Sequence, residues 1–133
     1  MKPLDHADVL PWQELARADL AMADLALADP HSTAAMYGLV CFHAQQAAEK
    51  SLKAALIAAD RPAPRTHSLV LLLDTCAGPT AAPDETLRAA AALNEYGIGP
   101  RYPGSYPPAT LAQARAARAD ADAVCGWALA RFG

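Results

Sequence analysis

Polar side chains gather on one face of segment 33–59, which the sequence predicts to be the longest helix. At about 100° per residue, one stripe of that helix carries His43, Gln46, Lys50 and Lys53, with Glu49 at its margin. Such a stripe is a candidate polar pocket for a nucleotide or RNA. The alternative is a solvated helix face, where pairs four residues apart contribute about 0.2–0.5 kcal/mol each. For His43 the alternative is a partly buried hydrogen-bonding role between helices.

A second candidate site is the loop before the last predicted helix, which its glycines and prolines keep out of regular structure. Arg101 in this loop is suited to gripping a phosphate or a partner carboxylate beside a helix N-terminus. The alternative is an ion pair with Glu95 or Glu49 of the same bundle. Tyr102 and Tyr106 either stack on a base or pack the loop onto the bundle through their rings and hydroxyls.

Other site chemistry lacks the necessary residue spacing. The histidines His6, His31, His43 and His67 do not have metal-ligand spacing, so no metal is expected, and His67 is interpreted as structural. The three cysteines are odd in number and widely spaced, which favours buried free thiols. No phosphate-binding glycine loop and no serine or cysteine nucleophile motif is visible, and no cofactor is predicted. A net charge of −3 argues against nonspecific binding to nucleic acid.

The elements that position these residues are helices. Apolar residues, mostly alanine and leucine, recur at helical spacing in five segments: 11–28, 33–59, 67–76, 84–96 and 109–132. No segment alternates as a strand would, so the sequence predicts an all-α fold. A length of 133 residues fits a single helical domain over residues 1–133. With no signal segment and no stretch that spans a bilayer, we expect a cytoplasmic protein without membrane contact.

The longest predicted helix also has a clear core face. Small and apolar side chains fall on one side of it at alternating steps of four and three: Tyr37, Cys41, Ala44, Ala48, Leu52 and Ala55. Phe42 and Ile57 lie within or beside the polar stripe instead. Exposed apolar side chains at that place indicate that another helix or a second subunit packs there.

Three segments resemble the HEPN family, named for higher eukaryotes and prokaryotes nucleotide-binding. Residues 42–54 are similar to its signature helix, F-x-x-Q-Q-A-x-E-K-x-L-K-A. Thr66-His67-Ser68-Leu69 resembles its T-H-(S/D)-L segment, and Leu93-Asn94 followed by Arg101-Tyr102-Pro103 resembles its L-N and R-Y-P segment. The resemblance implies an up-and-down four-helix bundle with a short additional helix, usually dimeric.

The resemblance also bears on catalysis. RNases of the family carry an Arg-x4-6-His motif that pairs across the dimer, with the histidine as acid or base. Arg101 matches the arginine, but the corresponding later positions hold Tyr106, Pro107 and Pro108, and no histidine follows. Because tyrosine is a poor base at neutral pH, RNase activity by that mechanism is not expected, and no catalytic residue is assigned.

The resulting hypothesis is a binding or partner module. It holds a nucleotide or RNA near Arg101 and the polar stripe, forms a homodimer, and acts with a minimal nucleotidyltransferase in a toxin–antitoxin-like or defence system. The rival hypothesis is a metal-independent RNase toxin that uses Arg101 with an unusual acid or base such as Tyr106 or His43. A purely structural dimer is the third.

Overall fold

A computed structural model describes residues 6–97 and 108–132. These residues form five α-helices and no strand: α1 (His6–Ala28), α2 (Ala34–Ala58), α3 (Leu69–Ala77), α4 (Asp84–Asn94) and α5 (Leu111–Phe132). The all-α prediction is therefore confirmed. No helix in these two ranges is long and apolar enough to cross a membrane. That residues 1–133 form a single domain stays a prediction.

Helix α2 is the central element, and the sequence specifies both its start and its buried face. Thr33 caps it, accepting a hydrogen bond at Oγ1 from the Met36 amide at 3.3 Å. The predicted core face is buried except at Tyr37, which is partly buried, and Cys41, Ala44 and Leu52 are fully enclosed. Buried alanines on α2 and α5 leave little side-chain bulk between these helices, which allows a close approach of their backbones.

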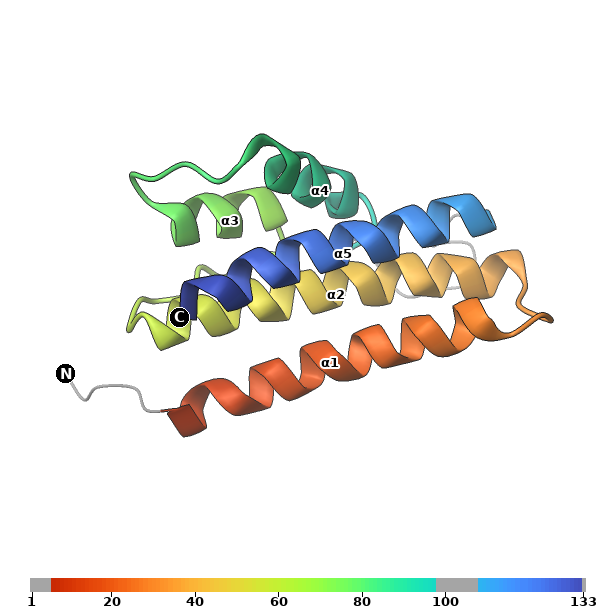
Figure 1. The fold of residues 1–133 in the computed structure, drawn as a ribbon, viewed down its shortest axis with the longest axis horizontal. Coiled ribbons are helices and arrows are strands. Elements are labelled where there is room, and N and C mark those ends of the chain that lie inside the picture. Colours follow the sequence, from red (N-terminus) through yellow and green to blue (C-terminus); the bar gives the residue numbers. More distant parts are fainter. Residues whose placement is uncertain (1–5, 98–107, 133) are drawn as a thin grey trace.

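The long helices pack side by side (Figure 1). Helix α1 runs antiparallel to α2, whereas α5 runs in the same direction as α2, and α3 and α4 cover the side away from α1. A backbone hydrogen bond of 3.1 Å from the Ala109 amide to the Ala34 carbonyl ties the start of α5 to the start of α2. The directions of α1, α2 and α5 are those of the expected up-and-down bundle.

Larger apolar side chains fill the space where α2 meets the short helices. The fully buried leucines of this region are Leu52, Leu56, Leu69, Leu72, Leu73 and Leu93. Elsewhere most buried apolar residues are alanines. The bulky part of the core therefore lies beneath α3 and α4, and it fixes these short helices against α2.

Several helix boundaries differ from the sequence prediction, and three of the differences follow from single residues. Helix α1 begins at His6, so Pro11 lies inside it rather than in its first turn, at the loss of one backbone hydrogen bond. Helix α3 begins at Leu69 because Ser68 is its cap and accepts from the Leu71 amide at 3.2 Å. Helix α4 ends at Asn94, two residues earlier than predicted, and the Asn94 side chain accepts a hydrogen bond from the Leu69 amide.

Candidate functional site

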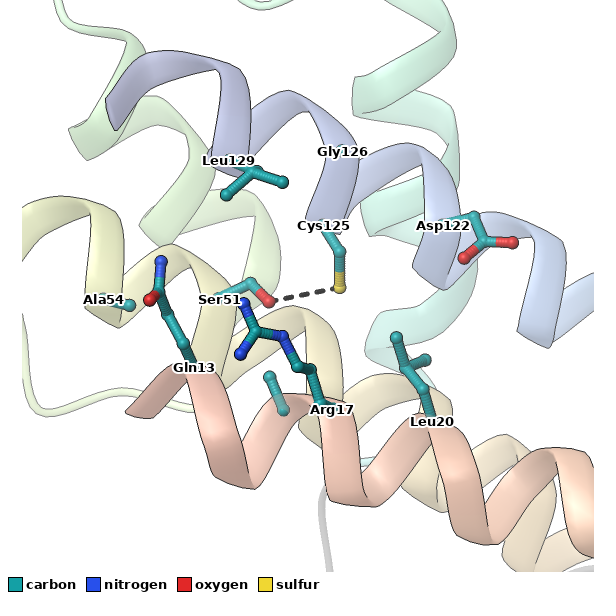
Figure 2. A pocket seen from close by; sticks show the side chains of 10 residues that line it. Gln13, Arg17, Leu20, Ser51, Ala54, Asp122, Cys125, Gly126 and Leu129 are labelled. Carbon is teal, nitrogen blue, oxygen red and sulfur yellow. Dashed lines mark hydrogen bonds between the residues drawn. The ribbon is translucent and has the colours of Figure 1, made fainter. Parts of the chain in front are cut away.

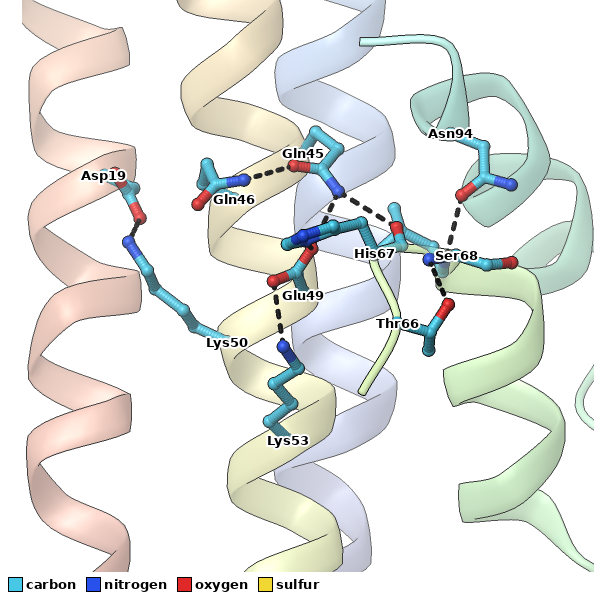
Figure 3. Close-up of polar contacts among 11 residues, drawn as sticks. Asp19, Gln45, Gln46, Glu49, Lys50, Lys53, Thr66, His67, Ser68 and Asn94 are labelled. Carbon is cyan, nitrogen blue, oxygen red and sulfur yellow. Dashed lines mark hydrogen bonds and ion pairs between the residues drawn. The ribbon is translucent and has the colours of Figure 1, made fainter. Parts of the chain in front are cut away.

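A buried carboxylate organises the polar face of α2. The Glu49 side chain is only 7% exposed, yet both of its oxygens are hydrogen-bonded (Figure 3). Its Oε2 accepts from Lys53 Nζ at 3.1 Å, and its Oε1 lies 3.1 Å from His67 Nδ1 and 3.2 Å from Gln45 Nε2. A buried charge is tolerated only when it is paired in this way. We call these four residues the Glu49 cluster.

Gln45 joins the cluster to its surroundings. Its side chain is fully buried, and its Nε2 also donates to the His67 carbonyl at 3.4 Å, while its Oε1 accepts from Gln46 Nε2 at 2.7 Å. Gly97 packs directly against this carboxamide, and an added Cβ there would collide with it. The chain after α4 therefore passes so close to the cluster that any side chain at position 97 would have to displace the Gln45 carboxamide.

The segment before α3 closes the cluster from the other side. Thr66 Oγ1 accepts from the Ser68 amide at 3.0 Å, and Asn94 Oδ1 at the end of α4 accepts from the Leu69 amide at 2.7 Å (Figure 3). Ser68 itself caps α3. These bonds fix the backbone on both sides of His67, so that its ring reaches Glu49.

His67 is the exposed member of the cluster. Its side chain is 69% exposed, although its Nδ1 faces a carboxylate that is almost buried. A carboxylate only accepts hydrogen bonds, so Nδ1 carries the proton, and in the neutral ring Nε2 remains an acceptor. This is the carboxylate–imidazole arrangement that orients a general base in many hydrolases.

A second buried carboxylate lies on the side of α2 that faces α1. Asp19 of α1 accepts from Lys50 Nζ at 2.6 Å, and its other oxygen lies 2.9 Å from His43 Nδ1. The Asp19 side chain is 11% exposed. Each buried carboxylate therefore holds one lysine and one histidine, and the two lysine charges are balanced by the two carboxylates.

The acidity of Glu49 follows from these contacts. Burial raises the pKa of its carboxyl, but the hydrogen bonds from Lys53, Gln45 and His67 together with the Lys53 charge outweigh burial. The net result is a pKa below the ordinary glutamate value, so the group is ionised at neutral pH. The cluster is thus a fixed anion with a lysine and an imidazole ordered around it.

The structure shows how far the polar stripe is buried and which partners its side chains have. The stripe is not a solvated face, because His43, Gln46, Lys50 and Lys53 are all partly buried and Glu49 is buried. Of the pairs four residues apart in the stripe, Glu49–Lys53 is present, whereas Lys50 pairs with Asp19 of α1. Lys53 Nζ also lies 6.0 Å from the centroid of the Trp12 ring, at the outer limit of a cation–π contact.

The other predicted site residues, Arg101, Tyr102 and Tyr106, lie outside the described residues, so their roles stay predictions. Within the described ranges no group of histidine, cysteine, aspartate or glutamate side chains has the arrangement to hold a metal ion. All three cysteines are free, and two of them, Cys41 and Cys76, are buried.

The sequence does not predict three residues of the two carboxylate sites as site residues. Gln45 is noted only as part of the family pattern, and Asp19 is not singled out. His67 is interpreted as structural, although its side chain is exposed beside Glu49. Signals for two of them exist, because Gln45 and His67 both fall within the segments that carry the family resemblance. For Asp19 no local signal exists, since its partners are 24 and 31 residues away.

Comparison with known proteins identifies the family. The model of the HEPN domain matches residues 11–131, nearly the whole chain, and the protein therefore belongs to the HEPN family. The fold is similar to the crystal structure of an archaeal HEPN homologue, with a TM-score of 0.74, 25% identity and full coverage of both chains. It is also similar to a crystal structure of a protein from Thermus thermophilus, with a TM-score of 0.73 and 27% identity over 92% of this chain and 97% of that one. No curated protein matches the chain.

Proposed function

We propose that this HEPN protein is a binding module that holds a phosphate-bearing ligand, a nucleotide or RNA, with the Glu49 cluster and Arg101 as the residues that contact it. The observation that carries the proposal is that separate segments of the sequence meet at one site. The signature helix and the Thr66–Leu69 segment lie far apart in sequence, yet they meet at Glu49, and Asn94 holds the Leu69 amide of that segment (Figure 3). Gly97, four residues before Arg101, packs on the same cluster.

Charge in the cluster bears on how a ligand is held. Lys50 and Lys53 are each paired with a buried carboxylate, so they offer donors but little net positive charge. Net attraction for a phosphate has to come from Arg101, whose charge is permanent. We therefore expect affinity to fall with added salt.

The proposed assembly is a homodimer that acts with a minimal nucleotidyltransferase in a toxin–antitoxin-like or defence system. Support for self-association comes from apolar side chains that α1 presents to solvent: Leu15 is 52%, Met22 53% and Leu25 66% exposed. They recur at steps of seven and three and so lie on one stripe of α1, which none of the described helices covers. Light scattering that gives the mass of a monomer at micromolar concentration contradicts the dimer.

The experiment is a paired one on the full chain. Binding of ATP and of a short RNA is titrated for the wild type, Arg101→Ala, His67→Gln and a matched control, Arg88→Ala, which removes an arginine of α4 that pairs with Asp120 on α5. We expect Arg101→Ala and His67→Gln to weaken binding about tenfold, and Arg88→Ala to leave it unchanged. Circular dichroism of each variant checks the fold. Equal affinities for all four proteins, or no binding by the wild type, contradict the proposal.

A second candidate function rests on one observation, the dyad of His67 and Glu49. If the protein is an RNase, His67 is a better placed acid or base than His43, because its ring is exposed while Nδ1 is oriented by a carboxylate. In that case RNA cleavage without metal is lost in His67→Gln and in Arg101→Ala. Cleavage that survives in both variants points to a contaminating nuclease.

A further inference from the structure

A pocket of about 240 Å³ opens between α1, α2 and α5, away from the Glu49 cluster (Figure 2). Small side chains on all three helices leave it unfilled, and leucines line it on two sides: Ala16 and Leu20 of α1, Ser51 and Ala54 of α2, Gly126 and Leu129 of α5. At Gly126 an added Cβ would meet no atom within 4 Å, so the glycine leaves open space beside the pocket. An apolar cavity of about 150 Å³ is enough to bind benzene in another protein.

The chemistry inside the pocket is neutral. Ser51 Oγ donates to Cys125 Sγ at 3.2 Å, which satisfies the polar group nearest the centre (Figure 2). Burial raises the pKa of the Cys125 thiol, and the Ser51 hydrogen bond lowers it only in part, so the thiol stays protonated at neutral pH. A protonated thiol behaves as a small apolar group. The interior therefore suits an apolar chain rather than a polar ligand.

The rim of the pocket carries one uncompensated positive charge. Gln13 and Arg17 of α1 point toward α2 and α5 at the edge of the pocket (Figure 2). Among the described residues Arg17 has no ion pair, whereas the acidic residue of the rim, Asp122, is already bound to Arg118 at 2.6 Å. An anionic group at the end of an apolar chain would complete this arrangement.

We propose that this pocket binds a small amphipathic anion, with its apolar chain between α1, α2 and α5 and its carboxylate on Arg17. The volume suits a chain of medium length, which would cover the leucine surfaces while its head stays in water. This binding is independent of the phosphate site proposed above, because the two share no residue and lie on different sides of α2.

The probe is octanoate, with octanol as its uncharged counterpart, titrated against the full chain by calorimetry and by thermal unfolding. We expect octanoate to bind and to raise the melting temperature, and octanol to bind about tenfold more weakly. Arg17→Gln should reduce octanoate affinity to that of octanol. The matched control is Arg65→Gln, which removes the same charge from the exposed linker between α2 and α3 and should change nothing.

Filling the pocket tests its location. Gly126→Leu places a side chain in the open space and should abolish binding of both probes, with the helical content checked by circular dichroism. If that variant does not fold, Leu129→Gln, at a residue that is 58% exposed, should weaken both probes without disturbing the core. The proposal fails if octanoate does not bind at millimolar concentration, if Arg17→Gln has no effect, or if binding survives Gly126→Leu. A third outcome also overturns the proposal. If octanoate does not bind the wild type and Gly126→Leu loses self-association, the pocket is a contact site for a second copy of the chain.

Discussion

Ion pairs connect α1 to the rest of the bundle in two regions. The distances between the paired atoms are similar in both regions, but the carboxylates are buried in one and exposed in the other. On the side of the Glu49 cluster, Asp19 binds Lys50 at 2.6 Å with a side chain that is 11% exposed. On the side of α5, Arg118 binds Asp24 at 2.7 Å and Asp122 at 2.6 Å, but those carboxylates are 56% and 67% exposed.

The two regions differ in how much water reaches their carboxylates. Water screens the exposed carboxylates around Arg118, so their removal costs little. Glu49 and Asp19 have lost their hydration, so their partners have to replace it completely, and a single missing partner leaves a buried charge. In the described part of the chain no buried side-chain nitrogen or oxygen lacks a hydrogen bond, which is the condition for such a cluster to persist. Equal distances thus correspond to unequal energies.

The largest expected effect is at the centre of the buried cluster. Glu49→Ala leaves the partly buried Lys53 ammonium without its carboxylate and Gln45 without an acceptor, so we expect the free energy of unfolding to fall by about 3 kcal/mol. Urea denaturation at pH 7 measures it. Because the folded pKa of Glu49 is depressed, its contribution is present above the unfolded carboxyl pKa and is lost as the pH falls through the folded one. The two proteins should therefore converge in stability only below about pH 4, under the ordinary glutamate pKa; a constant difference down to acidic pH contradicts this account.

A smaller effect is expected where the chain passes the cluster. Gly97→Ala forces the new Cβ into the Gln45 carboxamide, and we expect a loss of about 2 kcal/mol from overpacking. The matched control is Gly126→Ala, the same substitution inside α5 at a position with open space. It should instead stabilise the protein by about 0.5–1 kcal/mol, since alanine is the better helix former. Thermal unfolding measures the change in stability of both variants. If both melting temperatures shift in the same direction, contact with Gln45 is not the cause.

The smallest effect is expected at the exposed bridge. Arg118→Gln removes both ion pairs with Asp24 and Asp122, yet the free energy of unfolding should change by less than about 1 kcal/mol. The change should also shrink in high salt, which screens exposed charges. Denaturation at low and high ionic strength measures both. A loss as large as that of Glu49→Ala would mean that burial does not separate the two regions.

The sequence by itself determined the helical elements and the buried face of α2. Helical spacing of alanine and leucine and the glycine- and proline-rich loop are local signals, and local signals depend on neighbours within one or two turns. The same signals placed the polar residues of α2 on one stripe. They also pointed to the HEPN family, because its motifs are short runs of consecutive residues.

Only the tertiary structure decided which partners the residues of the polar stripe contact. Its lysines and histidines turn out to be the partners of two buried carboxylates, one of them on α1, and His67 reaches Glu49 from 18 residues away. Such pairs arise from helices that pack against each other, and no spacing along one helix encodes which charge of another helix will face it. The pocket beside Cys125 has the same origin: Ala54, Gly126 and Ala16 are ordinary small residues until three helices bring them together.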